Sequence, residues 1–339
     1  MRIALDAMGG DYAPGPNIDG AIAALQAHPD LEVVLVGDQL QLEPLLVKAG
    51  FSSERMILRH SDSWITMEEK PTEALRKKPN CSISVCWQMM AGREVDAVVS
   101  AGHTGAVVAA GLKTRLYLKN VKRPGIAVAL PTQKGRAVLM DVGANPAARP
   151  EHLFQYGIMG LVYARDVLGI ENPRVGLMNI GTEEGKGNAL ITETNELLKR
   201  VGEIINYAGP IEGFQVFTEH VDVVVCDGFV GNVALKASEG VARMLGDIAR
   251  EEFKRSIFSK LGALFARPAL QALRDRADPR NYNGASLVGL RGIVIKSHGS
   301  ADAFSFAHAI DVAVLETEKA VPERISHLLE ELLAGSDST

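Results

Sequence analysis

The chain has 339 residues, 47% of them hydrophobic, which is long enough for one large domain or two lobes with a substantial core. Its formal net charge of -5 and pI of about 6.0 exclude a global electrostatic basis for nucleic-acid binding. Its three cysteines form no CxxC pair, which predicts a reducing cytoplasmic compartment with neither a disulfide framework nor a zinc site.

The N-terminal part alternates short apolar runs with helical stretches. Residues 2–7 are predicted to form a strand that ends in a double-glycine turn, flanked by Asp6 and Asp11. An acid so early in the chain does not suit a signal peptide. Further strands are predicted at 31–37 and 56–60, with helices at 14–25, after the capping residue Asp38 and over most of 71–90.

The central part repeats a unit of strand, glycine-containing turn and helix. Residues 95–100 are predicted as a strand that runs into AGHTGA at 101–106 and then into a helix. A strand pair is expected at 126–130 and 137–142, and its second strand ends in DVGAN at 141–145. A helix is expected at 151–167.

The stretch RVGLMNIGTEEGKGN at 174–188 combines a buried strand, a glycine-rich loop and the start of a helix at about 189. Glycines allow backbone N–H groups to approach an anion, the helix N-terminus adds partial positive charge, and Lys186 adds a full one. The loop matches neither GxGxxG nor a P-loop. The alternative is a tight strand–helix turn with a solvated lysine.

The C-terminal part continues the pattern. A strand at 221–226 ends in DGFVGN at 227–232, and a strand at 290–296 ends in SHGSAD at 297–302, each before a helix. The last helix is expected at 321–333. No apolar stretch reaches the roughly 18 residues that a transmembrane helix needs. We expect one α/β domain over 1–334 and a disordered tail at 335–339.

This alternation predicts a doubly wound, mostly parallel α/β sheet, in which ligands bind at the carboxyl ends of the strands. Every unusual polar motif lies at such an end, so we expect a single cleft. The residues predicted to surround it are Asp6, Asp11, His103, Thr104, Asp141, Asn145, Lys186, Asn188, Asp227, Asn232, Ser297 and His298.

The side chains in this set favour an anionic ligand. No GxSxG motif supports an acyl-serine mechanism, and Cys226 is interpreted as a packed thiol because it lies inside an apolar strand. His103 and His298 follow strands and stand beside glycines, which modestly favours function over packing. The aspartates could bind a divalent metal, but their spacing matches no metal motif, and capping of helices and turns is preferred.

Residues 253–276 form a locally basic amphipathic segment, FKRSIFSKLGALFARPALQALRDR. At helical spacing its large apolar residues share one face, and Pro268 is expected to break or kink the helix. The residues predicted to contact a membrane are Ile257, Phe258, Leu261, Leu264 and Phe265. The alternative is an ordinary surface helix whose apolar face packs on the core or in a dimer.

Six motifs occur in order: LDAMGGD at 5–11, SAGHTGA at 100–106, DVGAN at 141–145, NIGTEEGKGN at 179–188, CDGFVGN at 226–232 and IVIKSHGSADA at 293–303. Together they closely resemble the bacterial phosphate acyltransferase PlsX family, from Arg2 to about Leu333. The resemblance implies a doubly wound α/β homodimer similar to isocitrate and isopropylmalate dehydrogenases and to phosphotransacetylase.

The same resemblance implies that a long-chain fatty acyl group moves from acyl carrier protein to inorganic phosphate, without a cofactor. The acyl phosphate would feed an acyl-phosphate:glycerol-3-phosphate acyltransferase in phospholipid synthesis. The resemblance also implies a cytoplasmic protein attached peripherally to anionic membrane, which favours the membrane interpretation of 253–276. His103 stands where family members commonly carry Asn, so a hydrogen-bonding role suits it better than that of a general base.

In the implied mechanism a phosphate oxygen attacks the thioester carbonyl directly, and the enzyme supplies positioning and charge stabilisation. Lys186 is assigned to phosphate, Asn232 and Thr104 to orienting phosphate or the carbonyl, and His298 to protonating the departing thiolate. The other residues expected to bind substrate or phosphate are Gly102, His103, Gly105, Gly185, Gly187, Asn188, Gly228, Gly231 and Ser297. The residues expected to position loops are Asp6, Asp11, Asp141, Asn145 and Asp227. No metal site is expected.

Three rival interpretations stay open. A short-chain phosphate acetyl- or butyryltransferase would use coenzyme A and need no membrane segment. An NAD-linked hydroxyacid dehydrogenase shares the fold class but would need an arginine cluster and metal-binding aspartates. A lipid-binding scaffold would leave the six polar motifs unexplained. Basic residues that could receive the acidic carrier protein, or face lipid, are Arg243, Arg250, Lys254 and Arg255.

Overall fold

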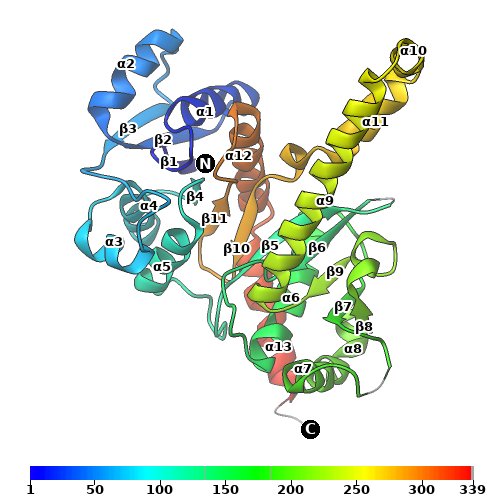
Figure 1. Ribbon diagram of the computed structural model, residues 1–339. Helices are drawn as coiled ribbons and strands as arrows, with labels where there is room; N and C mark the ends of the chain where they lie inside the picture. Colours follow the sequence, from blue (N-terminus) through cyan, green and yellow to red (C-terminus); the bar gives the residue numbers. More distant parts are fainter. Residues whose placement is uncertain (134, 184, 337–339) are drawn as a thin grey trace.

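The computed structural model describes residues 1–133, 135–183 and 185–336. Within these residues an eleven-stranded sheet runs through the molecule in the order β3-β2-β1-β4-β11-β10-β5-β6-β9-β7-β8 (Figure 1). The strands are β1 Arg2–Asp6, β2 Glu32–Gly37, β3 Met56–His60, β4 Ala97–Ser100, β5 Gly125–Pro131, β6 Arg136–Met140, β7 Val175–Asn179, β8 Tyr207–Glu212, β9 Val223–Val225, β10 Ala285–Val288 and β11 Ile293–Lys296. The predicted doubly wound, mostly parallel α/β fold is confirmed.

The first half of the sheet, from β3 to β11, is entirely parallel. Its strands are near-continuous apolar runs because both faces are covered by helices. One face packs on α1 (Gly15–Ala27) and α12 (Ala303–Glu318). These two helices cross so closely that a side chain at Gly20 would collide with Phe306. The other face carries α3 (Pro71–Lys77), α4 (Ser82–Ala91) and α5 (Thr104–Thr114), and α2 (Gln39–Ala49) lies beside β3.

The second half consists of β6, β9, β7 and β8, again all parallel. It packs on α6 (Pro150–Asp166), α7 (Ala189–Arg200), α8 (Gly202–Ile205) and α13 (Val321–Ser336) around Tyr156 and Met159. A short 3-10 helix, η1 (Gly213–Phe217), follows β8.

The two halves are joined by β10 and β5, which make the antiparallel pairings of the sheet. Going from β11 to β6 the chain direction reverses three times, so β1, β4 and β11 run opposite to β6, β9 and β7. The carboxyl ends of these two sets of strands therefore point in opposite directions.

A helical arm projects from the body and ends away from the sheet (Figure 1). It consists of α9 (Gly228–Lys254), α10 (Ile257–Phe265) and α11 (Arg267–Ala277), and it returns through η2 (Pro279–Tyr282). In the residues that are described, no helix is long and apolar enough to cross a membrane.

The arm differs from the single amphipathic helix that we expect from the sequence. Ser256 caps α10 by accepting a hydrogen bond from the Ser259 backbone N–H. The helix is therefore interrupted a first time just before the apolar residues of α10. The second break follows Phe265, and Pro268 occupies the first turn of α11, where a missing N–H costs nothing. The predicted proline break is confirmed, whereas the serine break was missed.

Two strands were also missed. β8 contains Gly209, at φ +94°, and Pro210, and β10 has only four residues, so neither shows a clear apolar run. The last helix, α13, is longer than expected and continues through Ser336; the end of the predicted tail, 337–339, lies outside the described residues. Cys81, Cys86 and Cys226 are free and buried, as expected for a packed thiol at Cys226.

Candidate functional site

Three of the six motifs meet where β1, β4 and β11 end. The backbone N–H of Asp11 donates to the Gly299 carbonyl at 2.8 Å, and the N–H of Ser297 donates to the Ser100 carbonyl at 2.9 Å. The Ser100 hydroxyl donates to Asp6 Oδ2 at 2.7 Å and accepts from the Gly102 N–H at 3.1 Å. Neighbouring parallel strands bring their carboxyl ends to one edge, which is why motifs nearly 300 residues apart are in contact.

Asp6 stands at the base of this group. Its side chain is 2% exposed, and burial raises the pKa of its carboxyl above the ordinary value, against the effect of nearby serine hydroxyls. Its second oxygen, Oδ1, is buried and has no hydrogen-bond partner among the described residues. The Asn17 amide holds the adjoining turn by donating to the carbonyls of Asp6 and Gly9, both at 3.0 Å.

Asn283, which the sequence did not single out, fastens the loop after β11. Its Nδ2 donates to Ser297 Oγ and to the Ser305 carbonyl, both at 2.7 Å. Its Oδ1 accepts from the His298 backbone N–H at 2.9 Å. The asparagine comes directly after η2, so the segment that closes the arm also determines where Ser297 and His298 lie.

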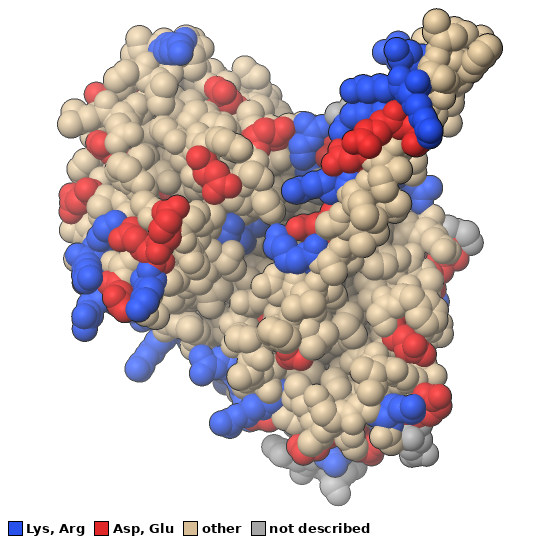
Figure 2. Space-filling model, viewed as in Figure 1, with Lys and Arg blue, Asp and Glu red and all other residues tan. Residues whose placement is uncertain are grey.

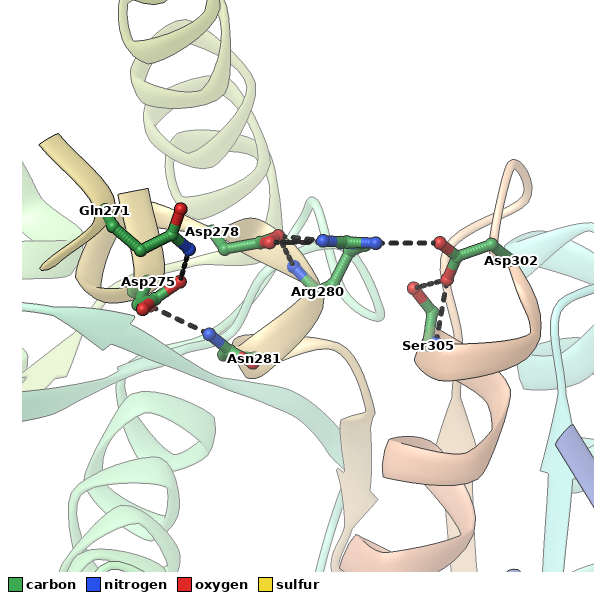
Figure 3. A network of polar contacts seen from close by, with 7 residues as sticks. All are labelled: Gln271, Asp275, Asp278, Arg280, Asn281, Asp302 and Ser305. Atoms are coloured by element: carbon green, nitrogen blue, oxygen red, sulfur yellow. Dashed lines mark hydrogen bonds and ion pairs between the residues drawn. The ribbon is translucent and has the colours of Figure 1, made fainter. Parts of the chain in front are cut away.

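A second contact ties the root of the arm to the same loop (Figure 3). The Arg280 guanidinium lies between two carboxylates, Asp278 at 2.7 Å and Asp302 at 3.1 Å. Asp302 is the N-cap of α12 and accepts from the backbone N–H and the hydroxyl of Ser305. These two carboxylates raise the pKa of Arg280, so it is a permanent cation at this junction.

His298 is held in one tautomer. Its Nδ1 accepts from the Ser300 backbone N–H at 3.2 Å and lies 2.9 Å from the Ser300 hydroxyl, which leaves Nε2 to carry the proton of the neutral ring. Partial burial and the positive charges of Lys236 and Lys296 lower the pKa of His298. The ring is therefore neutral at pH 7. A neutral ring can donate a hydrogen bond from Nε2 but is a poor source of a proton, which argues against the expected acid role.

His103 has a local role. It caps α5, with Nδ1 accepting from the Gly105 backbone N–H at 3.0 Å. An asparagine could cap the same helix through its side-chain oxygen, which agrees with a hydrogen-bonding role. Gly102 is buried beneath it, and Thr104 opens the helix.

The DVGAN and DGFVGN motifs form a second group, at the ends of β6 and β9. Asp141 is buried and accepts four backbone N–H bonds, from Ile126, Gly143, Ala144 and Asn145, at 2.7–3.1 Å. The Asn145 amide donates to the Pro124 carbonyl and to the Tyr156 hydroxyl, both at 2.6 Å. These contacts hold the turn after β6 against β5 and α6.

The helix α9 starts against this turn. Asp227 caps it by accepting from the backbone N–H groups of Phe229 and Val230. Side chains at Gly228 and Gly231 would collide with Asp141 or Asn145, so glycine is required at both positions for close approach. Asn232 is exposed and lies over Gly143.

The Lys186 loop follows β7, the strand next to β9. Its glycines have the positive φ values that the loop needs, +84° at Gly185 and +104° at Gly187. Asn179 closes the loop by donating to the carbonyls of Gly181 and Lys186 at 2.9 and 3.1 Å. Asn188 caps α7 through a bond from the Ile191 N–H. Gly185, Lys186, Gly187 and Asn188 are all exposed.

The residues predicted to surround one cleft thus come from two sets of oppositely directed strands, because β10 and β5 reverse the chain direction between them. The helix α9 leads from one group toward the other. Lys236 lies one turn beyond Asn232 on the same helix face, and its charge acts on both His298 and Lys296. The sequence gave no sign of this link, because nothing local distinguishes Lys236 from other surface lysines.

Of the four aspartates, Asp141 and Asp227 accept hydrogen bonds from backbone N–H groups, and Asp6 accepts one from the Ser100 hydroxyl. Among the described residues, no group of three or more His, Cys, Asp and Glu side chains could hold a metal ion.

The end of the arm exposes large apolar side chains. Phe258 is 83% and Phe265 84% exposed, and Ile257, Leu261 and Leu264 are also exposed. Figure 2 shows Lys and Arg, with some Asp and Glu, along the arm below a tip whose visible face carries no charged side chains. None of the residues that the structure describes covers these side chains, so a partner would be needed to bury them.

The overall fold is that of the phosphotransacetylases. A phosphotransacetylase from Streptococcus pyogenes matches with a TM-score of 0.64 at 15% identity, over 94% of both chains. The EutD phosphotransacetylase from Staphylococcus aureus matches with a TM-score of 0.59 at 13% identity, also over 94% of both chains. At such identities the likeness concerns the fold alone.

Closer relatives define the family. Residues 1–324 match the family model described as "Fatty acid synthesis protein". The phosphate acyltransferase of Halorhodospira halophila is 48% identical over 99% of this chain and 98% of its own, and that of Alkalilimnicola ehrlichii is 47% identical over 100% and 98%. The chain belongs to the phosphate acyltransferase PlsX family and is an acyltransferase.

Proposed function

We propose that this enzyme transfers a long-chain fatty acyl group from acyl carrier protein to inorganic phosphate, giving acyl phosphate for phospholipid synthesis. The observation that carries the proposal is the set of six family motifs, each placed at the carboxyl end of a strand in a phosphotransacetylase-like fold. Relatives named phosphate acyltransferase support acyl transfer to phosphate. The identity of the acyl donor, acyl carrier protein, is the more specific part of the proposal.

In the proposed mechanism a phosphate oxygen attacks the thioester carbonyl without a covalent enzyme intermediate. Lys186 and the backbone N–H groups of Gly187 and Asn188 bind phosphate, and Thr104 and Asn232 orient phosphate or the carbonyl. Because His298 is a neutral Nε2–H donor, we assign it to the carbonyl oxygen, where negative charge develops, in place of proton transfer.

The arm is proposed to attach the enzyme peripherally to an anionic membrane from the cytoplasmic side. The exposed apolar residues of α10 would enter the interface, and Lys254, Arg255 and Lys260 would face lipid phosphates. This location would pass acyl phosphate directly to a membrane acyl-phosphate:glycerol-3-phosphate acyltransferase.

A homodimer is also proposed. The helix α9 exposes Val241, Met244, Leu245 and Ile248, each 49–57% exposed, on consecutive turns. Such a row is typical of a helix that packs against a second copy. The acidic carrier protein would bind basic residues of the arm such as Arg243 and Arg250.

The decisive experiment measures release of carrier-protein thiol from palmitoyl-acyl carrier protein, with and without inorganic phosphate. We expect phosphate-dependent release, with acyl phosphate formed in equal amount. Release that is independent of phosphate would overturn the proposal. Turnover of acetyl-CoA in place of the palmitoyl donor would instead favour a short-chain phosphate acyltransferase.

The phosphate contact of Lys186 is tested by Lys186→Met. Removing the charge should raise the KM for phosphate and lower kcat by roughly tenfold or more, since a charged hydrogen bond contributes about 1.5–3 kcal/mol. Lys199→Met, an exposed lysine on α7, is the matched control. Unchanged kinetics of Lys186→Met would remove Lys186 from the site and leave the overall reaction unaffected.

A further inference from the structure

The segment between β3 and α3, residues 61–70, lies against the motifs that meet at the ends of β1, β4 and β11, although it belongs to none of the six. A Cβ atom at Gly299, in the loop after β11, would lie 2.8 Å from the terminal methyl group of Met67. A Cβ atom at Gly105 would likewise lie 2.9 Å from Cγ of Pro71, the first residue of α3. Both side chains therefore pack directly on the backbone of motif loops.

The inner part of this segment closes the base of the site. Ile65 is 7% exposed and lines a cavity of about 10 Å³ together with Asp6 and His103. Such a volume holds about one water molecule. Met67, two residues further along the chain, is 41% exposed. The segment thus buries one apolar side chain beneath the site and presents the other at its surface.

Lys78, which follows α3, fastens the segment on both sides of Met67. Its ammonium donates to the Trp64 carbonyl at 2.9 Å and to Glu69 Oε2 at 2.7 Å. The same Glu69 oxygen accepts from the Thr66 backbone N–H at 2.9 Å. One lysine therefore joins the residues before and after Met67, and it holds this side chain against the loop after β11.

Backbone hydrogen bonds anchor the start of the segment separately from this lysine. The Ser82 N–H donates to the Ser63 carbonyl at 2.9 Å, and the Asp62 N–H donates to the Asn80 carbonyl at 3.2 Å. The segment is therefore attached to the start of α4 by bonds that do not involve Lys78. Loss of the lysine's contacts should release the part that carries the methionine and leave its surroundings folded.

Met67 packs on Gly299, the residue next to His298, which is assigned above to the thioester carbonyl. The acyl chain begins at that carbonyl, so an exposed apolar side chain beside the histidine loop is suitably placed to contact the chain. A methionine is unbranched and flexible, and it can follow the chain as the thioester becomes an acyl phosphate.

Building on the proposed function, we propose that Met67 contacts the substrate by packing on the first methylene groups of the fatty acyl chain. Lys78 is the positioning residue that holds Met67 at this place. The segment 61–70 is thus a wall of the acyl-donor site, contributed by a stretch that lies outside the motifs.

The first test varies the side chain at position 67, with palmitoyl-acyl carrier protein and inorganic phosphate as substrates. Met67→Leu, Met67→Ala and Met67→Ser should raise the KM for the acyl donor in that order, to about tenfold in the serine variant, because apolar contact is lost. The KM for phosphate should keep its wild-type value. Leu40→Ala, which changes an exposed apolar residue on α2, is the control. Since Met67 is exposed, the urea midpoint of unfolding should not change.

Inhibition by the thiol form of the carrier protein distinguishes the acyl chain from the arm that bears it. This form has the thiol arm but no acyl chain, so its inhibition constant should be the same in wild type and Met67→Ala. An inhibition constant that rises as much as the donor KM would assign Met67 to the arm and overturn the proposal. A wild-type donor KM in Met67→Ser, or an equal rise in the KM for phosphate, would overturn it as well.

Lys78→Met tests the positioning role. Without the bonds to Trp64 and Glu69 it should raise the donor KM about as much as Met67→Ala does, and combining the two changes should give no further rise, because both act through one contact. Lys78→Arg keeps N–H donors at this position and should recover most of the loss. Lys77→Met, which removes an exposed lysine at the end of α3, is the matched control.

A wild-type donor KM in Lys78→Met, or losses that add up in the double variant, would contradict the positioning role. Absence of phosphate-dependent release in the wild type would instead contradict the proposed function itself.

Discussion

The body and the arm of this protein are stabilised in opposite ways. In the body, buried and half-buried polar side chains join separate elements, as Asp141 does for four backbone N–H groups and Asn283 for the loop after β11. In the arm, the polar contacts of α9 are exposed pairs three residues apart, such as Arg250 with Asp247 and Arg255 with Glu252. The body is therefore suited to hold a site in place, and the arm to expose a surface.

Asp141→Ala should give the largest effect, because it leaves four backbone donors, one buried and three partly buried, without their acceptor. We expect a loss of roughly 3 kcal/mol or more in the free energy of unfolding, measured by urea denaturation. Asp141→Asn keeps an oxygen at this position, so its free energy of unfolding should lie between those of wild type and Asp141→Ala. An alanine variant within about 1 kcal/mol of wild type would contradict this account of the body.

Asn283→Ala tests the junction of body and arm. It removes three hydrogen bonds, two of them to the loop that carries Ser297 and His298, and should lower kcat by about 10²-fold through misplacement of that loop. Asn281→Ala is the matched control, since among the described residues its amide donates to the Asp275 carbonyl, within the arm (Figure 3). Equal activity of the two variants would show that the loop is positioned without Asn283.

Glu316→Gln tests a buried acid in the body. Its Oε2 accepts from the Ser286 hydroxyl at 2.9 Å, and burial raises the pKa of its carboxyl to about 8. Since the unfolded chain releases this proton near its ordinary pKa, wild-type stability should fall as the pH rises from about 5 to 8, by up to about 1.4 kcal/mol per pH unit.

Glu316→Gln should lose most of this decrease of stability with pH. Glu318→Gln, which changes an exposed residue on α12, should retain it. The measurement is the urea midpoint at pH 5, 6, 7 and 8. The same pH dependence of stability in wild type and both variants would show that a group other than Glu316 causes it.

Replacing Phe258 and Phe265 together by Ser should have the smallest effect on stability, within about 0.5 kcal/mol, because both side chains are already exposed. Binding to anionic phosphatidylglycerol vesicles, measured by sedimentation, should nevertheless fall by about tenfold or more, since two apolar anchors are lost. Phe214→Ser, exposed on the body, is the control. Retained vesicle binding in the double variant would assign membrane contact to another surface.

Much of this architecture was determined by the sequence alone. Apolar runs of about six residues followed by small-residue turns identified most of the strands, because a strand buried on both faces must be apolar along its length. The sequence also determined the caps at Asp38 and Asp227 and the break at Pro268, because each depends on one residue and the backbone next to it.

The tertiary structure decided how those pieces meet. Strand direction depends on the pairing of β10 and β5, which no local pattern reveals, and it divides the motifs between two sets of oppositely directed strands. Lys296 was part of a recognised motif but not of the predicted site, because the charges that act on it, those of Asp6, Asp11 and Lys236, come from the β1 turn and from α9. A side chain's chemistry depends on everything packed around it, and most of that surrounding is remote in sequence.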